Sequence, residues 1–334
     1  MNKSILFTSP GVAELIDCDI PTVDDDEVLV KLERSSISAG TERANLTEGV
    51  RVSYGEQPTP WPRHCGYSAS GVVCEVGALI KKIKVGDRVA CSGSCHAQYC
   101  ALKEKRVHLL PDSVSFAAAA LVYIGTFPLA AIRKCGLEMG EAAIVMGQGV
   151  LGMMAVKLLR AAGASPIVAV DPVASKRELA LKLGADAVLD PFERDFAKKA
   201  KEITEGGAHV AIEVTGLGQG LDQVLDCMRR HGRVALLGCT RDADFTIDYY
   251  RKVHGPGITL VGAHTTARPK QDSSHGWWTD ADDAHALIRL CATGRFDLGE
   301  LVEDVFSPVE APAVYRRLVT DRCFPVVQFD WRLL

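Results

Sequence analysis

The feature that most constrains the fold is a glycine-rich turn that follows a short apolar strand and begins a helix. The segment AAIVMGQGVLG places glycines at positions 147, 149 and 152, directly before the helical pattern GMMAVKLLRAAG. A second apolar run, PIVAVD, ends at Asp171, nineteen residues after Gly152. This order of strand, turn, helix, strand and acidic residue is typical of a dinucleotide-binding βαβ unit. The segment from Ala142 to Asp171 therefore predicts a parallel sheet that binds a dinucleotide.

Each glycine has a physical role in this predicted site. Gly147 permits the tight turn, Gly149 lets the backbone approach a pyrophosphate, and Gly152 allows close packing of helix on strand. The helix N-terminus offers unpaired N–H groups and a partial positive charge to the phosphates. The predicted cofactor-binding residues are Gly147, Gln148, Gly149, Val150, Leu151, Gly152, Asp171 and Arg177.

The acidic residue at position 171 favours NAD(H) over NADP(H). Its carboxylate would accept hydrogen bonds from ribose hydroxyls and repel a 2′-phosphate. Lys176 and Arg177 follow closely and could hold a phosphate. The alternative for both residues is the solvated face of the next helix.

Six apolar runs alternate with helical patterns between Ala142 and His264. The runs are AAIVMG, PIVAVD, AVLD, HVAIEVTG, GRVALLG and ITLVGAH. The helical patterns GMMAVKLLRAAG, SKRELALKLG and LDQVLDCMRRHG each end in a glycine, where we expect a left-handed cap. Strands separated by helices require parallel crossovers, so the segment predicts a doubly wound α/β sheet.

The N-terminal part has a different pattern of predicted secondary structure. The runs EVLVKLERSSIS, SGVVCEVG, DRVACSG, AQYCAL and RVHLL are short, with no helices of matching length between them. This pattern predicts a compact, mostly antiparallel β domain. After His264 come a polar loop, the amphipathic helix ADDAHALIRLCATG and short strands ending in PVVQFDW, which we expect to complete the first domain.

Length and charge limit the other classes of protein. The 334 residues suit two domains. The net charge is only −4, and the Lys and Arg residues are scattered among Asp and Glu along the sequence. Neither nucleic acid nor a membrane is expected as a partner. The apolar run from Phe116 to Ile132 is broken by Gly125, Thr126 and Pro128, which favours a buried helix and turn. The N-terminus lacks a secretory pattern, and the eleven cysteines have no repeating spacing, so a cytoplasmic protein with reduced thiols is expected.

With the dinucleotide segment in mid-chain and β segments on both sides, the sequence resembles the medium-chain dehydrogenase/reductase superfamily, of the alcohol and polyol dehydrogenase type. The motifs that carry the resemblance are AGTE at 39–42, GYSASGVVCEVG at 66–77, VGDRV at 85–89, HAQY at 96–99, LPDSVS at 110–115, LKLGADAVLD at 181–190, IEVTG at 212–216 and HGRVALLG at 231–238. The resemblance implies a GroES-like catalytic domain over 1–115 and 270–334, with a Rossmann NAD-binding domain over 116–269.

The same resemblance implies that the family's catalytic zinc is absent. Aligning the motifs puts Ala39 at the family's cysteine ligand, Tyr67 at its histidine and Ser68 at its glutamate. Tyr123 aligns with the family's third ligand. Alanine cannot bind a metal, and neutral tyrosine is a poor zinc ligand. We therefore expect no metal ligands at these positions and no catalytic zinc.

A separate cysteine cluster, Cys91, Cys95, His96 and Cys100, is weighed as a zinc site. Its spacing departs from the paired CxxC of a zinc ribbon, and Ala97 to Leu102 alternates like a strand. A strand sends successive side chains to opposite faces, which opposes convergent ligands. Metal binding by this cluster is left open.

Without zinc, a side chain must handle the proton of the reacting hydroxyl. The candidates are Tyr67, its possible neighbour Tyr123, Thr41 at the family's proton-relay position and Glu42 as a supporting acid. Packing for Tyr67, a turn cap for Thr41 and an ion pair with Arg43 for Glu42 are the structural alternatives.

We therefore expect a zinc-independent, NAD(H)-dependent dehydrogenase that transfers hydride to or from a secondary alcohol or ketone of a polyol, sugar or related small molecule. One alternative is a zinc-free NAD(P)H-dependent quinone or enone reductase. Another is a dinucleotide-binding protein without turnover. A homodimer or homotetramer is expected from the resemblance, with ITLVGAH near a sheet edge at the interface.

Overall fold

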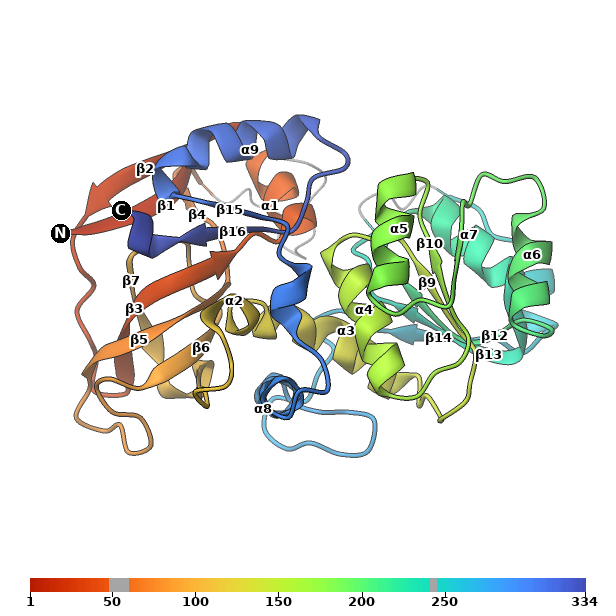
Figure 1. Ribbon diagram of the computed structural model, residues 1–334, viewed down its shortest axis with the longest axis horizontal. Coiled ribbons are helices and arrows are strands. Elements are labelled where there is room, and N and C mark those ends of the chain that lie inside the picture. Colours follow the sequence, from red (N-terminus) through yellow and green to blue (C-terminus); the bar gives the residue numbers. More distant parts are fainter. Residues whose placement is uncertain (48–59, 241–244) are drawn as a thin grey trace. The chain divides into compact units, whose positions relative to one another are not determined.

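A computed structural model describes residues 1–47, 60–240 and 245–334 (Figure 1). The chain forms two compact units. Unit 1 comprises Met1–Ile124 and Ala284–Leu334, and unit 2 comprises Gly125–Asp283. The sequence analysis placed the changes of domain after residues 115 and 269.

Unit 2 is built on a parallel sheet whose strands alternate with helices. Within the described residues its strands are β9 (Ala143–Met146), β10 (Ile167–Val170), β11 (Ala187–Leu189), β12 (Ala208–Glu213), β13 (Met228–Leu236) and β14 (Thr259–Gly262). They lie in the order β11-β10-β9-β12-β13-β14, and each neighbouring pair is parallel. This is the doubly wound Rossmann order, so the predicted fold of this unit is confirmed.

Helices follow the strands of unit 2, and a glycine ends two of them as expected. These helices are α4 (Val150–Ala161), α5 (Ala174–Lys182), α6 (Phe196–Ile203) and α7 (Gly218–Asp226). Gly163 and Gly184, after α4 and α5, have φ of +85° and +112°. These left-handed conformations confirm the two predicted caps.

The third predicted helix, LDQVLDCMRRHG, was wrong in its second half. Helix α7 ends at Asp226, and β13 begins at Met228, which pairs with Ala208 of β12. His231, rather than Gly232, is the residue there whose φ is positive, at +62°. Pairing with β12 therefore overrides the helical pattern of this segment.

The apolar run from Phe116 to Ile132 forms two helices. They are α2 (Phe116–Ala119) and α3 (Val122–Lys134). The predicted buried helix is confirmed, but the break expected at Gly125, Thr126 and Pro128 is wrong, because α3 continues through all three. Helix α8 (Asp280–Ala292) follows the polar loop near the C-terminus. In the part of the chain that the structure describes, no helix is long and apolar enough to cross a membrane.

Unit 1 contains two sheets in its described residues. One has the order β2-β1-β4, with β1 (Asn2–Ser9), β2 (Val12–Cys18) and β4 (Arg63–His64). The other has the order β15-β16-β3-β5-β6-β8, with β7 also paired to β3. Its strands are β3 (Glu27–Ser36), β5 (Ser68–Val76), β6 (Arg88–Ser92), β7 (Tyr99–Lys103), β8 (Val107–Leu109), β15 (Asp304–Phe306) and β16 (Val327–Asp330). All pairs except β15 with β16 are antiparallel, which confirms the mostly antiparallel GroES-like domain.

The C-terminal tail completes unit 1, as expected. Strand β16 pairs with β3, placing Gln328 opposite Ser36. Helix α9 (Ala311–Thr320) contributes Tyr315 to the core, where its ring meets the edge of Phe7. The first and last parts of the chain thus share one apolar core.

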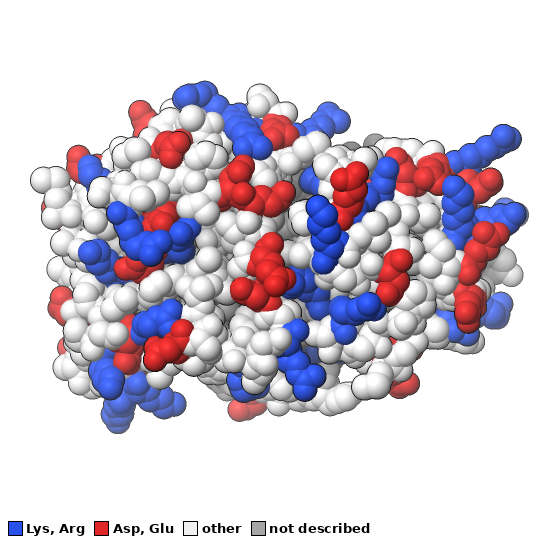
Figure 2. All heavy atoms as spheres, in the orientation of Figure 1, with Lys and Arg blue, Asp and Glu red and all other residues white. Residues whose placement is uncertain are grey.

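Acidic and basic side chains are interspersed on the face of the molecule shown in Figure 2. The even mixture of charges along the sequence is therefore also present on this part of the surface.

Candidate active site

Tyr67, which directly precedes β5, lies among the hydroxyl groups of unit 1. Its hydroxyl donates a hydrogen bond to Ser38 Oγ, just before helix α1 (Ala39–Leu46), and it is also hydrogen-bonded to the Thr41 side chain. The Tyr123 ring meets the Tyr67 ring edge to face, with centroids 5.8 Å apart. Three predicted catalytic residues, Tyr67, Tyr123 and Thr41, are thus brought together by α1, α3 and the start of β5.

Burial controls the protonation of this tyrosine. Loss of hydration raises the pKa of Tyr67 well above its usual value, although hydrogen bonds with Ser38 and Thr41 oppose the shift. The phenol is therefore protonated at neutral pH. In this state the Tyr67 hydroxyl can donate a hydrogen bond, as it does to Ser38.

The residues that the sequence analysis aligned with the family's zinc ligands are poor ligands themselves. Ala39 has no donor atom, and the Ser68 hydroxyl donates a 2.7 Å hydrogen bond to the carbonyl of Ala120. Tyr67 is a protonated phenol. These groups do not fit zinc, which binds thiolate, imidazole and carboxylate ligands.

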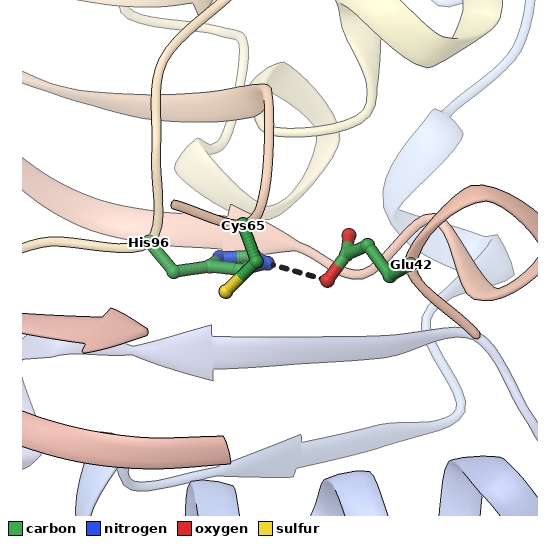
Figure 3. A group of neighbouring side chains, drawn as sticks. All are labelled: Glu42, Cys65 and His96. Atoms are coloured by element: carbon green, nitrogen blue, oxygen red, sulfur yellow. Dashed lines mark hydrogen bonds and ion pairs between the residues drawn. The ribbon is translucent and has the colours of Figure 1, made fainter. Parts of the chain in front are cut away.

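A different group of potential ligands lies deep in unit 1 (Figure 3). Glu42 comes from α1, Cys65 follows β4, and His96 precedes β7. Their ligand atoms all lie within 4.8 Å of one another, and His96 Nε2 is 3.2 Å from Glu42 Oε2. This is the one such group found among residues 1–47, 60–240 and 245–334. All three residues are almost completely buried.

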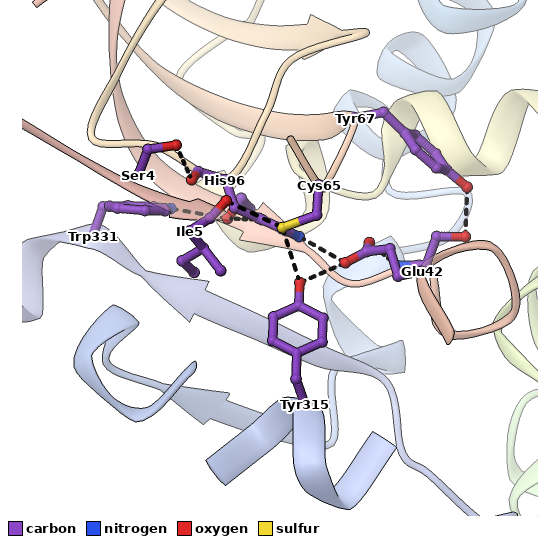
Figure 4. Close-up of polar contacts among 10 residues, drawn as sticks. Ser4, Ile5, Glu42, Cys65, Tyr67, His96, Tyr315 and Trp331 are labelled. Atoms are coloured by element: carbon purple, nitrogen blue, oxygen red, sulfur yellow. Dashed lines mark hydrogen bonds and ion pairs between the residues drawn. The ribbon is translucent and has the colours of Figure 1, made fainter. Parts of the chain in front are cut away.

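Hydrogen bonds connect this group to distant elements (Figure 4). The Tyr315 hydroxyl donates to Glu42 Oε2 at 2.5 Å, and the Ser38 backbone N–H donates to Glu42 Oε1 at 2.7 Å. The Cys65 thiol donates to the carbonyl of Ile5 at 3.3 Å. The carboxylate and the thiol are thus already hydrogen-bonded within the protein.

On its other side, the His96 ring contacts Ser35. His96 Nδ1 is 2.7 Å from Ser35 Oγ, which also accepts a hydrogen bond from the Trp331 indole. The ring therefore has polar partners at both nitrogens, which fixes its orientation. Ser38 Oγ and the Ser38 backbone N–H connect Tyr67 with Glu42, so the two groups adjoin.

Glu42, Cys65 and His96 have side chains of the types that bind zinc, but the Cys65 thiol is in the wrong protonation state for a ligand. Carboxylate, thiolate and imidazole are zinc ligands, and zinc sites use three or four of them. However, burial raises the pKa of the Cys65 thiol well above its usual value, and the thiol donates to a carbonyl. The expectation that this chain lacks zinc ligands is therefore not confirmed.

The cysteine cluster weighed from the sequence does not converge. His96 faces Glu42, whereas Cys95 Sγ lies 3.2 Å from Cys100 Sγ. The one group of described residues whose ligand atoms lie within 4.8 Å of one another contains His96 with Glu42 and Cys65, and none of the three cysteines of this cluster. Cys95 and His96 are adjacent in the chain but contact different residues, so the cluster does not gather around one point.

In unit 2, the glycine-rich turn has the predicted form. Gly147 has φ of +97°, which favours glycine, and helix α4 begins at Val150 with Gly149 as its N-cap. A Cβ atom on Gly152 would lie 1.9 Å from the carbonyl oxygen of Gly147. Only glycine therefore allows α4 to pack this closely on the turn.

Asp171 and Arg177 lie at the end of β10 and on α5. The Asp171 carboxylate accepts hydrogen bonds from the backbone N–H groups of Gln148, at 2.8 Å, and Val173, at 2.9 Å. Arg177 Nη1 donates to the Asp171 carbonyl at 2.7 Å and lies 3.2 Å from Asp190 Oδ2. The acid is thus fixed beside the turn, and the Arg177 guanidinium contacts Asp190 and the backbone.

The sequence analysis did not identify Cys65, Tyr315, Ser38 or Ser35. Tyr315 and Glu42 are 273 positions apart, and no local pattern connects them. The signal nearest to Cys65 is Gly66, whose φ is +80° and whose Cβ would lie 2.6 Å from the His96 ring. The need for glycine beside a histidine emerges only when the two segments are placed together.

Comparisons with known proteins cover nearly the whole chain. Residues 24–154 match the alcohol dehydrogenase GroES-like domain, and residues 150–275 match the zinc-binding dehydrogenase family. The chain is 30% identical to an L-threonine 3-dehydrogenase of Caldanaerobacter subterraneus, over 95% of both chains. It is 29% identical to a D-arabitol-phosphate dehydrogenase of Enterococcus avium, over 92% of both. The structure of a zinc-binding dehydrogenase from Sinorhizobium meliloti 1021 bound to NADP superposes with a TM-score of 0.83 at 22% identity, over 99% of each chain.

Proposed function

We propose that this chain, which belongs to the alcohol dehydrogenase-type family of medium-chain dehydrogenases/reductases, is an NAD(H)-dependent oxidoreductase for a secondary alcohol or ketone of a polyol, sugar or related small molecule. We propose further that it acts without zinc at the family's usual positions. The printed names of the relatives support an activity on alcohols, since L-threonine 3-dehydrogenase and D-arabitol-phosphate dehydrogenase are among them.

The geometry around Tyr67 is the observation that carries this proposal. Its protonated hydroxyl, at the position of a metal ligand in relatives, is hydrogen-bonded to Ser38 and Thr41. A bound nicotinamide would supply hydride chemistry. Tyr67 would then give its proton to the oxygen of a ketone substrate, and Ser38 and Thr41 would stabilise the phenolate that remains.

Replacing this hydroxyl tests the proposal. Tyr67→Phe keeps the ring that packs on Tyr123 but loses the hydrogen bonds to Ser38 and Thr41, so we expect a folded protein about 1 kcal/mol less stable, with a kcat about 10²–10⁴-fold lower for ketone reduction. Tyr250→Phe, at an exposed tyrosine in unit 2, is the control and should be fully active. Wild-type kcat in Tyr67→Phe across the substrate panel would refute the assigned role.

We propose NAD(H) as the preferred cofactor because Asp171 is fixed beside the turn that would hold the pyrophosphate. Its negative charge would repel a 2′-phosphate. We expect Asp171→Ala to bind NAD more weakly, and the ratio of its affinities for NAD and NADP to fall. Glu202→Ala, at an exposed acidic residue of α6, is a control that should retain the wild-type cofactor preference. A wild-type enzyme that prefers NADP would contradict this proposal.

Zinc independence has a separate test, because Glu42, Cys65 and His96 have the chemistry of ligands. The proposal expects less than stoichiometric zinc by elemental analysis and full activity after exhaustive chelation. Stoichiometric zinc that is lost in Cys65→Ser would instead identify a metal centre at these three residues, and would overturn this part of the proposal.

A substrate panel separates this function from the two other functions expected from the sequence. Ketone or polyol turnover supports the proposal. Turnover of enones alone would identify the quinone or enone reductase, and the absence of turnover despite tight cofactor binding would identify the non-catalytic protein.

A further inference from the structure

Two cysteines beside the candidate active site have sulfur atoms in contact. Cys95 Sγ lies 3.2 Å from Cys100 Sγ. Cys95 belongs to the turn before β7, and Cys100 belongs to β7 itself, opposite Val30 of β3. A disulfide has an S–S length of about 2.0 Å, so a shift of roughly 1 Å would join the two sulfurs.

The two thiols differ in exposure. Cys95 is partly exposed, whereas Cys100 is buried, with 4% of its surface accessible. A reagent from solvent can thus reach Cys95 first. Cys100 would then act from inside, which is the arrangement of an attacking and a resolving cysteine.

We propose that Cys95 and Cys100 form a site of reversible disulfide modification, with low-molecular-weight disulfides as the oxidants. The Cys95 thiolate attacks the external disulfide, forming a mixed disulfide and releasing one thiolate. Cys100 then loses its proton and attacks the Cys95 sulfur, releasing the second thiolate. The protein thiols lose two electrons, and the external disulfide is reduced to two thiols.

The turn that carries Cys95 is hydrogen-bonded to the backbone around Tyr67. The Gly93 N–H donates to the Tyr67 carbonyl, and the His96 N–H donates to the Cys65 carbonyl, both at 2.8 Å. Movement of Cys95 toward Cys100 would therefore disturb both hydrogen bonds. We expect amide hydrogen exchange at Gly93 and His96 to change on oxidation and to recover on reduction.

The test treats the protein with glutathione disulfide, unfolds it in denaturant with N-ethylmaleimide so that buried free thiols are also blocked, and maps the peptides by mass spectrometry. We expect a peptide with a Cys95–Cys100 disulfide in the wild type, which dithiothreitol removes. Cys100→Ser should instead retain glutathione on Cys95. Cys323→Ser, at an exposed cysteine, should form the disulfide like the wild type.

Alkylation of both Cys95 and Cys100 after oxidation, while Cys74 and Cys323 carry glutathione, would overturn the proposal. Because Cys100 is buried, its variant needs a folding check by circular dichroism. Cys95→Ala, at the partly exposed position, gives an independent result: Cys100 should then remain alkylatable and form no disulfide.

Discussion

At the scale of single residues, the buried Glu42 carboxylate organises the centre of unit 1. It accepts hydrogen bonds from the Ser38 backbone and from Tyr315, and it faces His96. Hydrogen bonds to a charged group are stronger than those between neutral groups, and a buried carboxylate that loses one is costly. Glu42 thus connects α1 with α9 and with the turn before β7.

Removing the Tyr315 hydroxyl, one of the donors to Glu42, shows how much this hydrogen bond contributes to the stability of the protein. We expect Tyr315→Phe to lower the free energy of unfolding by about 2 kcal/mol, because the ring stays packed while Glu42 loses a hydrogen bond. Urea denaturation gives this value directly. Tyr249→Phe, at an exposed ring, is the control, and equal stability of the two variants would exclude the proposed importance of this hydrogen bond.

The sequence predicted which residues surround Tyr67, but it did not predict the residues that are hydrogen-bonded to Glu42 from distant parts of the chain. Alignment of short motifs placed Thr41, Tyr67 and Tyr123 together, and the structure has them adjacent. Cys65 and Tyr315 were missed because their proximity to Glu42 depends on how α9 and β4 pack, which no local pattern encodes. The roles of these residues in catalysis remain predictions.

At the scale of elements, two glycines of the turn before α4 have separable functions. A Cβ on Gly152 would collide with the Gly147 carbonyl, whereas a Cβ on Gly149 would meet nothing within 4 Å. Gly149 also has φ of −78°, which alanine adopts without strain. Packing therefore requires glycine only at position 152 of the pair.

This difference predicts opposite outcomes for two similar substitutions. Gly152→Ala should displace α4, lower the melting temperature and abolish NADH binding. Gly149→Ala should melt like the wild type but bind NADH more weakly, because its methyl group would face the predicted pyrophosphate. Thermal melting and NADH titration of both variants check the prediction, which fails if Gly152→Ala is as stable as the wild type.

An ion pair connects the C-terminal strand β16 with β3, and its contribution to stability depends on pH. Asp330 Oδ2 lies 2.8 Å from Arg332 and 2.9 Å from Arg34. The hydrogen bond from Arg332, with the charge of Arg34, lowers the pKa of Asp330. A depressed carboxyl pKa stabilises the folded protein above the unfolded pKa of about 3.9, and this stability is lost as the pH falls through the folded value.

We therefore expect Asp330→Asn to lower the free energy of unfolding by roughly 3 kcal/mol at pH 7, since Arg34 is half-buried and loses its partner. The difference from the wild type should shrink as the pH falls below about 4. Urea denaturation between pH 2 and 7 measures both curves. A difference that stays constant with pH would contradict the assignment.

At the scale of the whole molecule, β14 ends the parallel sheet of unit 2. It pairs with β13 on one side, and Leu260 on it is 39% exposed. An apolar side chain on an end strand suits contact with a second copy of the chain. This agrees with the homo-oligomer expected from the family resemblance, which stays a prediction.

Charge on this strand should break such a contact. We expect the wild type to sediment as a dimer or tetramer in analytical ultracentrifugation and Leu260→Lys to sediment as a smaller species. Leu181→Lys, at a leucine of α5 with 44% exposure, is the matched control and should behave like the wild type. A wild type that is a monomer would refute the prediction.

The sequence by itself determined the sheet of unit 2 and the glycine turn with Asp171. These properties lie in short segments, where side-chain spacing and backbone freedom act locally. Tertiary structure alone decided that α7 would end before Met228, that α9 would bring Tyr315 to Glu42, and that Cys95 would meet Cys100 rather than His96. Each depends on contacts between segments whose closeness only the packed core creates, because side-chain direction is fixed by the fold and not by spacing.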